Sequence, residues 1–176
     1  AFFGKGLVVH VTFSFVVWFL TVFALLTAVV THRLAEEGYG ATRLLVLGRL
    51  GMSMVGLSFP MLLLPAFLNG SEASLNNYVP LIVHPVSEAG LALLFIGVLL
   101  PAIRLLANRP WDAGTREPLA LPVTAAALIY AAAFAAFAIA LAQTSGKAGQ
   151  GKVYEEIFWG GGHILQFLNS TLMLVA

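Results

Sequence analysis

Three histidines in apolar stretches are the residues of this sequence best suited to metal or redox chemistry. His10 lies in "GLVVHVTFSFVVWF", His84 in "VPLIVHPVSEAG" and His163 in "EEIFWGGGHILQF". Neutral imidazole is the usual nitrogen ligand of heme iron and of copper. The chain has no cysteine, so any metal must be held by histidine or by oxygen. The search for a site therefore starts from these histidines.

The last apolar stretch, residues 153–176, carries a polar stripe at helical spacing. Its members recur at intervals of three and four and are Glu156, Trp159, His163, Gln166 and Ser170. Because a charged group in lipid costs about 2.5–3.5 kcal/mol, we expect this face to turn toward the bundle interior, a cavity or a cofactor. The three glycines at 160–162 would let a flat cofactor approach, with ordinary helix packing as the alternative.

A second polar face is predicted around His84, Ser87 and Glu88. A carboxyl in a dry site is pushed toward its neutral form and can shuttle a proton, so the pattern indicates a proton-relay or quinone-binding patch. A structural hydrogen bond between His84 and Glu88 is the alternative. For His10 the alternatives are a metal ligand or a hydrogen bond to a neighbouring helix, and His32 is expected in a solvated loop.

The segments that carry these residues are long and apolar. The chain is 60% hydrophobic and 10% charged, with a mean hydropathy of +0.93, outside the range of water-soluble domains. About 20 apolar helical residues cross a hydrocarbon core of ~30 Å. Stretches of that length lie at 7–30, 44–68, 79–106, 119–142 and 153–176. We predict an all-α integral membrane protein, a single-domain bundle of five transmembrane helices over residues 1–176.

Charges are few, and their positions predict an orientation. The net charge of +1 gives no field for nucleic acid. The first and third loops carry Arg33, Arg43, Arg104, Arg109 and Arg116. The opposite side carries Lys5, Lys147 and Lys152. Since basic residues favour the cytoplasmic side, we place the first and third loops in the cytoplasm, which puts His10, His84 and His163 in the outer half of the bundle.

Two of the apolar stretches resemble helices of a known family. "YEEIFWGGGHILQF" resembles the sixth transmembrane helix of subunit I of the heme-copper oxidase superfamily, where a run such as "YQHLFWFFGH" ends in the histidine that binds the active-site copper. The residues matched in register are Tyr154, Phe158, Trp159, Gly162 and His163. "GLVVHVTFSFVVWF" resembles the second helix, whose histidine is an axial ligand of the low-spin heme. The resemblance implies that His163 binds copper and His10 binds low-spin heme iron.

The resemblance also implies a larger assembly. The predicted spans would be helices two to six of a twelve-helix-type subunit, and we expect the chain to be a piece of a longer polypeptide. The third span looks like the fourth helix of divergent members and gives His84 no role. The expected cofactors are low-spin heme, high-spin heme and copper. The expected partners are membrane lipid, other oxidase subunits and an electron donor, cytochrome c or quinol. The expected location is the bacterial or archaeal plasma (inner) membrane, crossed several times.

Two positions depart from the family pattern. Many oxygen reductases have a tyrosine four residues after the copper histidine and a glutamate two residues after it, where this chain has Phe167 and Leu165. These departures argue against a standard A-type enzyme. C-type oxidases supply the tyrosine from another helix and nitric oxide reductases have none, so both remain open.

The resemblance implies roles for the residues around His163. Glu155, Glu156 and Gln166 are the candidate catalytic residues, the two glutamates for proton delivery, and Trp159 and Gly162 are expected beside the cofactor. The implied function is a terminal oxidase that passes electrons through heme to a heme-copper centre, where dioxygen is reduced to water with proton uptake. The alternatives are a nitric oxide reductase of the same superfamily, a multispan transporter and a cytochrome b-like membrane protein.

Overall fold

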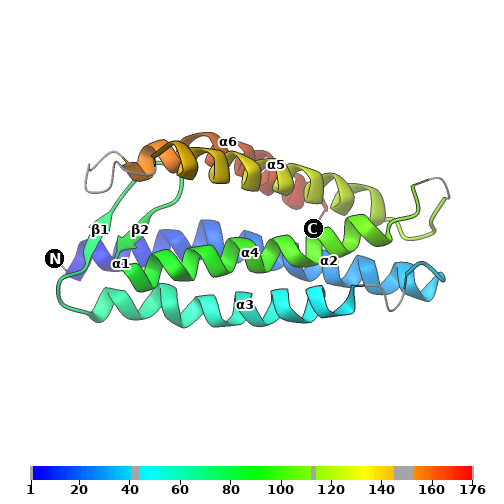
Figure 1. Ribbon diagram of the computed structural model, residues 1–176, viewed down its shortest axis with the longest axis horizontal. Coiled ribbons are helices and arrows are strands. Elements are labelled where there is room, and N and C mark those ends of the chain that lie inside the picture. The colour runs from blue at the N-terminus through cyan, green and yellow to red at the C-terminus, as the bar shows by residue number, and fades with distance from the viewer. Residues whose placement is uncertain (1, 41–43, 112–113, 145–152, 176) are drawn as a thin grey trace.

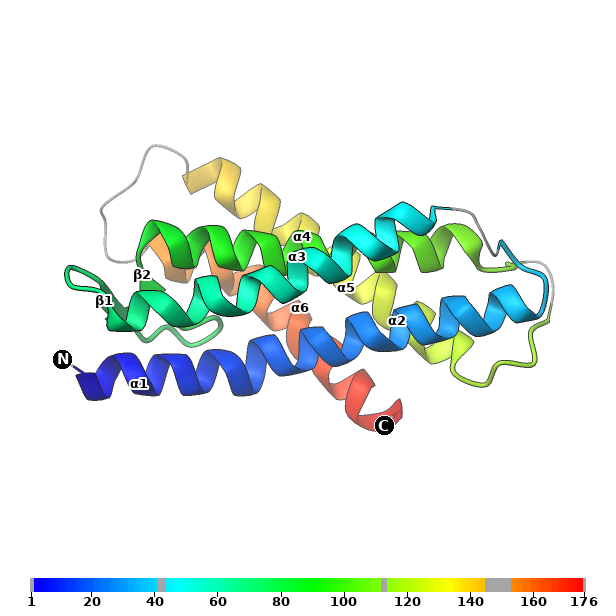
Figure 2. The same ribbon diagram turned by 90° about the horizontal axis from the view of Figure 1, so that it is seen from below.

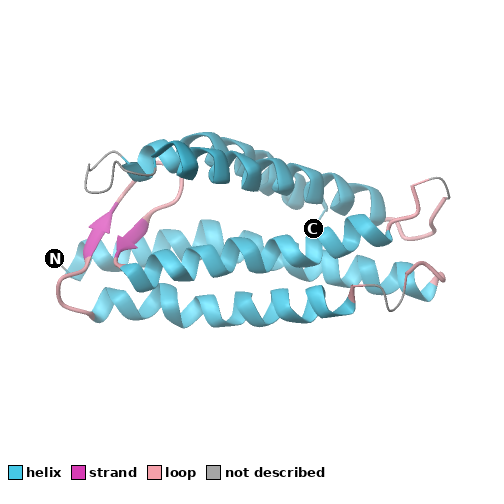
Figure 3. Ribbon diagram, in the orientation of Figure 1, coloured by secondary structure: helices cyan, strands magenta, loops and turns pink. Residues whose placement is uncertain are grey.

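The computed structural model describes residues 2–40, 44–111, 114–144 and 153–175. Within these ranges the chain is a bundle of long helices with one short β-hairpin (Figure 3). The elements are α1 (Phe2–Val11), the π-helical segment η1 (Thr12–Val17), α2 (Trp18–Glu36), α3 (Leu45–Leu63), the 3₁₀ segment η2 (Leu64–Phe67), β1 (Glu72–Ser74), β2 (Leu81–Val83), α4 (Pro85–Asn108), α5 (Ala120–Thr144) and α6 (Val153–Val175).

Helices long and apolar enough to cross a membrane form at four of the predicted positions. They are Phe3–Glu36, Leu45–Phe67, Pro85–Asn108 and Ala120–Thr144. α6 forms over the predicted range but is not among them, since its polar stripe lowers the hydropathy of the helix. The helical fold and its apolar helices are thus confirmed, and the fifth span stays a prediction.

The first helix is longer than its apolar stretch. α1, η1 and α2 follow one another without a break, and the helix Phe3–Glu36 has 34 residues, or roughly 50 Å at ~1.5 Å per residue. The expectation that His32 lies in a loop was therefore wrong. Its side chain is exposed on α2, with Nδ1 3.5 Å from Oε1 of Glu36 one turn later.

The long helices run up and down, so that α1, α4 and α6 start at the same end of the bundle (Figure 1). α3 lies along α4, and α5 with α6 forms a second layer, in which α6 crosses the first helix obliquely (Figure 2). Small residues allow the closest approach. A Cβ on Gly51 would lie 2.5 Å from the carbonyl oxygen of Gly97, so the backbones of α3 and α4 touch there.

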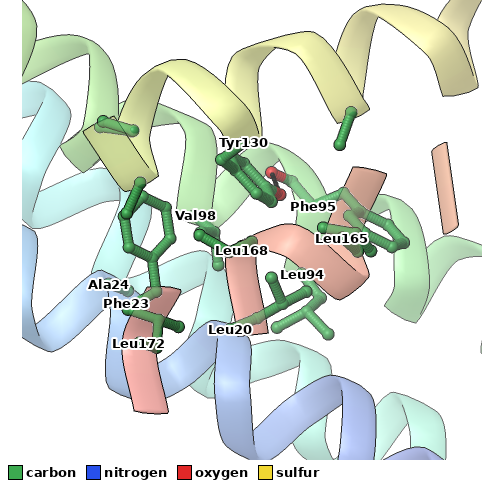
Figure 4. Close-up of a cluster of buried hydrophobic side chains, with 14 of the residues drawn as sticks. Leu20, Phe23, Ala24, Leu94, Phe95, Val98, Tyr130, Leu165, Leu168 and Leu172 are labelled. Carbon is green, nitrogen blue, oxygen red and sulfur yellow. Dashed lines mark hydrogen bonds between the residues drawn. The ribbon is translucent and has the colours of Figure 1, made fainter. Parts of the chain in front are cut away.

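A hydrophobic core joins the two layers (Figure 4). Phe23 of α2, Leu94 of α4, Tyr130 of α5 and Leu168 of α6 are each 0% exposed. The hydroxyl of Tyr130 donates a hydrogen bond of 2.7 Å to the carbonyl oxygen of Phe95, which satisfies the one polar atom of this ring inside the core. α6 is therefore held to the rest of the chain by its apolar face.

The arginines of the first and third loops lie mainly at the opposite end from the hairpin. Arg33 in the last turn of α2 donates to the buried carboxylate of Glu117, with 3.1 Å between Nη1 and Oε2. Arg109 caps the end of α4, whereas Arg104 lies within α4 and not in the loop. Arg43, Lys147 and Lys152 lie outside the described residues. The orientation of the chain in a membrane stays a prediction.

The hairpin was not predicted and replaces the start of the third expected span. Residues Leu81–Val83 pair antiparallel with Glu72–Ser74. Asn76 holds the loop, since its Oδ1 accepts from the Val79 amide at 2.7 Å and its Nδ2 donates to the Val79 carbonyl at 2.6 Å. α4 begins at Pro85. Proline is favoured at the first position of a helix, because the N–H that it lacks would have no partner within the helix there. The prediction of a helix from residue 79 was therefore wrong.

Candidate functional site

His163 is held in the tautomer that a metal ligand requires. Its Nδ1 lies 2.7 Å from the carbonyl oxygen of Trp159, one turn earlier on α6. Because a carbonyl oxygen only accepts, Nδ1–H is the donor of this hydrogen bond, and in the neutral ring Nε2 then keeps its lone pair. Ligating histidines are commonly oriented in this way, through a hydrogen bond from the second ring nitrogen to a backbone carbonyl. His163 thus fits a copper ion as a single Nε2 ligand.

Two aromatic rings enclose the imidazole of His163. The ring of Tyr78, from the loop between β1 and β2, lies 4.8 Å from it between centroids, and the ring of Trp159 lies 4.9 Å from it. The sequence does not point to Tyr78, because nothing in it places a residue of that loop against α6. The two rings limit the directions from which a ligand can reach the imidazole.

The three glycines before His163 have different surroundings. A Cβ on Gly161 would lie 2.5 Å from the ring of Phe137 on α5, and one on Gly162 would lie 2.6 Å from Cβ of Tyr78. A Cβ on Gly160 would meet no atom within 4 Å. Gly161 and Gly162 therefore allow close packing, which was the alternative to a cofactor surface. Gly162 makes room for Tyr78, whose ring lies against the imidazole of His163.

The polar stripe of α6 points away from the core of the described chain. All five of its members are exposed: Glu156, Trp159, His163, Gln166 and Ser170. The buried face of α6 is instead formed by Phe158, Gly161, Gly162, Leu165, Leu168 and Leu172. Of the three predicted surroundings, the interior of the bundle is excluded, because a different, apolar face of α6 packs in the core. Gln166 lines a small cavity, and a cofactor beside the stripe stays a prediction.

His10 lies on an exposed surface next to an irregular part of its helix. The π-helical turn η1 begins two residues later, and the buried hydroxyl of Thr12 donates to the carbonyl oxygen of Pro80 at 2.6 Å. π-helical turns occur frequently at functional sites. This bond ties the first helix to the loop that also carries Tyr78. The side chain of His10 is exposed, and its role as a ligand stays a prediction.

A small cavity of about 280 Å³ lies between the first helix and α6. Its walls include Val11 and Phe15 on one side, Gly162 and Gln166 on the other, and Tyr78 between them. A site for a drug-sized ligand already needs ~300–1,000 Å³, so this space is too small for a heme. Neither His10 nor His163 lines it. Any group that these histidines bind would therefore lie on the outer surface of the described helices.

His84 does not share a helix face with Glu88. It is the N-cap of α4, in extended conformation, and its Nδ1 accepts a hydrogen bond of 3.2 Å from the amide of Val86. The alternative interpretation was a hydrogen bond between the two side chains. Glu88 instead bonds to α6, where its Oε1 accepts from the hydroxyl of Tyr154 at 2.6 Å. Sequence spacing missed this pair, which joins α4 to α6 across 66 residues.

The remaining candidate residues lie near the start of α6. Glu155 and Glu156 are exposed in its first turn, where the helix dipole favours a carboxylate. Within the ranges that the structure describes, no three side chains of His, Asp or Glu converge on one point. One histidine is a weak copper site by itself, since the metal requires further ligands fixed around it.

Comparisons with known proteins give one distant relative. No family model matches the chain, and no solved structure is significantly similar to it. The chain is 31% identical over 103 residues to a protein of Aquifex aeolicus (strain VF5) described as "Uncharacterized protein". The aligned part makes up 58% of this chain and 27% of that protein, so the chain spans just over a quarter of the relative's length.

Proposed function

We propose that this chain is part of the catalytic subunit of a respiratory terminal oxidase of the heme-copper superfamily, in a bacterial or archaeal plasma membrane. The observation that carries the proposal is the geometry of His163, whose Nδ1 lies 2.7 Å from the Trp159 carbonyl oxygen and whose side chain is exposed on α6. This is the state in which an imidazole binds copper, and it occurs at the histidine that the family resemblance selects.

A second feature supports the same proposal. His10 and His163 lie on helices that start at the same end of the bundle, and both side chains are exposed. In the predicted orientation, the end of the bundle at which these helices start lies in the outer half of the membrane. Two exposed imidazoles leave room for large planar groups beside the described helices, which the small cavity between these helices does not offer.

The proposed roles of the residues rest on the family resemblance, and their positions are compatible with them. His163 would hold copper through Nε2, and His10 would hold low-spin heme iron. When bound, these groups supply electron transfer and the reduction of dioxygen to water. The backbone carbonyl of Trp159 would orient the imidazole of His163, and the ring of Tyr78 would pack against it. Glu155 and Glu156 would take up protons one to two turns before the histidine, and Gln166 would orient water along the same face.

Nitric oxide reduction by the same superfamily is the second candidate. It is favoured by Phe167, which stands where many oxygen reductases have a tyrosine that donates an electron and a proton. Phe167 is 69% exposed on α6, beside the polar stripe, and its ring has no ionisable hydrogen. The glutamate pair at the start of α6 would deliver protons in either reaction.

Substitution of each histidine in the full-length protein tests the proposal. His163→Ala should abolish bound copper and turnover and leave the low-spin heme spectrum in place. His10→Ala should remove the low-spin heme band. The matched control is His32→Ala, an exposed histidine at the other end of the first helix, which should leave both metal content and spectrum unchanged. Metal analysis and optical spectroscopy of the purified variants measure these effects.

Two results would contradict the proposal. Full copper content and turnover in His163→Ala would show that α6 does not carry the copper ligand. A colourless wild-type protein would leave a transporter as the better explanation of the polar faces on α4 and α6.

A further inference from the structure

A large cavity is lined by the hairpin, the first turns of α4, the last turns of α5 and the start of α6. Its volume is about 930 Å³, near the upper limit for sites that bind small organic molecules. It is separate from the small cavity between the first helix and α6, and the two share no lining residue. Nothing in the proposed roles of the histidines makes use of this space.

Polar and apolar groups are segregated along this cavity. The polar side chains come from the hairpin, the start of α4, the end of α5 and the start of α6, and they are Glu72, Ser74, Glu88, Thr144 and Tyr154. These elements meet at one end of the bundle (Figure 1). The remaining walls are aliphatic and aromatic. From Glu88 to Ile96 the apolar wall of α4 extends about 12 Å at ~1.5 Å per residue. A ligand that fits has one polar end and an apolar body.

The apolar part of the cavity has an aromatic wall. The rings of Phe95 and Phe137 lie 5.0 Å apart between centroids, and Phe137 meets Phe158 edge to face at 5.9 Å. Gly161 leaves the space that the Phe137 ring occupies. Aromatic rings arranged in this way offer both faces and edges to another ring. The wall therefore suits a planar ring better than a saturated chain alone.

The polar end offers hydrogen-bond acceptors to the ligand. Oε1 of Glu88 accepts from Tyr154 at 2.6 Å, which fixes the carboxylate in position, and Oε2 has no partner among the described residues. Glu72 adds a second carboxylate to the same lining. Two carboxylates repel a phosphate or a fatty acid and favour a neutral head group that donates hydrogen bonds.

We propose that this cavity binds an isoprenoid quinol. One ring hydroxyl donates to Oε2 of Glu88, the ring packs against Phe95 and Phe137, and the start of the tail follows Leu91 and Ile96. Only the role of the quinol rests on the proposed function. In the oxidase, the quinol would be the electron donor in place of cytochrome c. Binding itself requires no metal.

Photolabelling of the full-length protein in detergent tests the cavity directly. The probe is a tritiated azido-ubiquinol, kept reduced so that its ring hydroxyls can donate, and the competitor is decylubiquinol. We expect the label on peptides from α4 and α5 that contain Phe95 and Phe137, and we expect excess competitor to remove it. Equal competition by oleate or by a short-chain phosphatidylcholine would overturn the proposal, because it would mean that the cavity holds an acyl chain.

A matched pair of variants on α5 separates the cavity from a general effect on the helix. Ala138 is exposed and lines the cavity, whereas Ala135 is exposed and does not line it. Ala138→Trp should lower specific labelling at least fivefold, and Ala135→Trp should leave it unchanged. Equal labelling in both variants would overturn the proposal.

A second pair tests the polar end. Glu88→Gln removes the charged acceptor and should weaken competition by decylubiquinol about tenfold, as expected for a hydrogen bond to a charged group. The control is Glu36→Gln, which changes an exposed carboxylate at the other end of the bundle and should have no effect. An unchanged affinity in Glu88→Gln would contradict the assigned role of Glu88.

The two proposals fail separately. Specific labelling of a protein that contains no heme would support the quinol cavity and overturn the oxidase function. A heme-containing protein without specific labelling would overturn the quinol cavity alone.

Discussion

At the scale of single residues, two adjacent glycines determine what surrounds His163. Gly161 makes room for Phe137 of α5, which forms part of the large cavity, and Gly162 makes room for Tyr78, which lies on the imidazole. Gly160 has no neighbour within 4 Å of the position of a Cβ. A run of glycines that the sequence leaves ambiguous thus has position-specific roles, and substitutions within it should differ in their effects.

Alanine substitutions at Gly162 and Gly160 should change stability in opposite directions. Gly162→Ala places a methyl group 2.6 Å from Cβ of Tyr78, which has no flexible end at that point, so overpacking should cost about 1–3 kcal/mol. Gly160→Ala should gain up to about 1 kcal/mol from helix propensity. The measurement is the free energy of unfolding of the full-length protein in detergent. Equal effects of the two substitutions would show that Tyr78 does not pack on Gly162.

At the scale of elements, the contact between α3 and α4 depends on small residues. Gly51 and Gly97 face each other, and the side chain of Pro101 would lie 2.6 Å from a Cβ on Gly51. Gly56, on the same helix as Gly51, is exposed and would meet no atom within 4 Å. The pair Gly51 and Gly56 therefore separates helix packing from helix propensity.

Gly51→Leu should separate α3 from α4, because the side chain has no space between the two backbones. We expect a loss of at least about 3 kcal/mol in unfolding free energy, the upper range for overpacked sites. Gly56→Leu should be neutral or slightly stabilising, since leucine favours a helix more than glycine does. Thermal unfolding of the two full-length variants measures the difference. Similar melting temperatures would contradict the packing of α3 on α4.

The sequence predicts the helices well and the connections poorly. Hydropathy places α3, α5 and α6 within a few residues of their observed bounds, because their apolar runs end at polar turns. It fails at residues 79–84, where "VPLIVH" is apolar enough for a span but Pro80 and Pro85 favour an extended segment. It also does not reveal the π-helical turn after His10, since no residue type marks that geometry.

At the scale of the whole molecule, the candidate site lies on the outer surface of the described helices. The spacing on α6 correctly groups its polar residues on one face, but it does not show which face packs on the other helices. That choice depends on complementary apolar residues on α2, α4 and α5, which only the fold brings together (Figure 4). Likewise the pairing of Glu88 with Tyr154 depends on how the fold brings the start of α6 beside the start of α4.

The central claim is that the full-length protein is a heme-copper enzyme. The most direct test is a metal analysis of the purified protein together with its reduced-minus-oxidised optical spectrum, recorded before and after addition of carbon monoxide. The account predicts heme in both low-spin and high-spin forms, bound copper and a spectral shift with carbon monoxide. A colourless protein, or one with heme but no copper and no reaction with carbon monoxide, would contradict it.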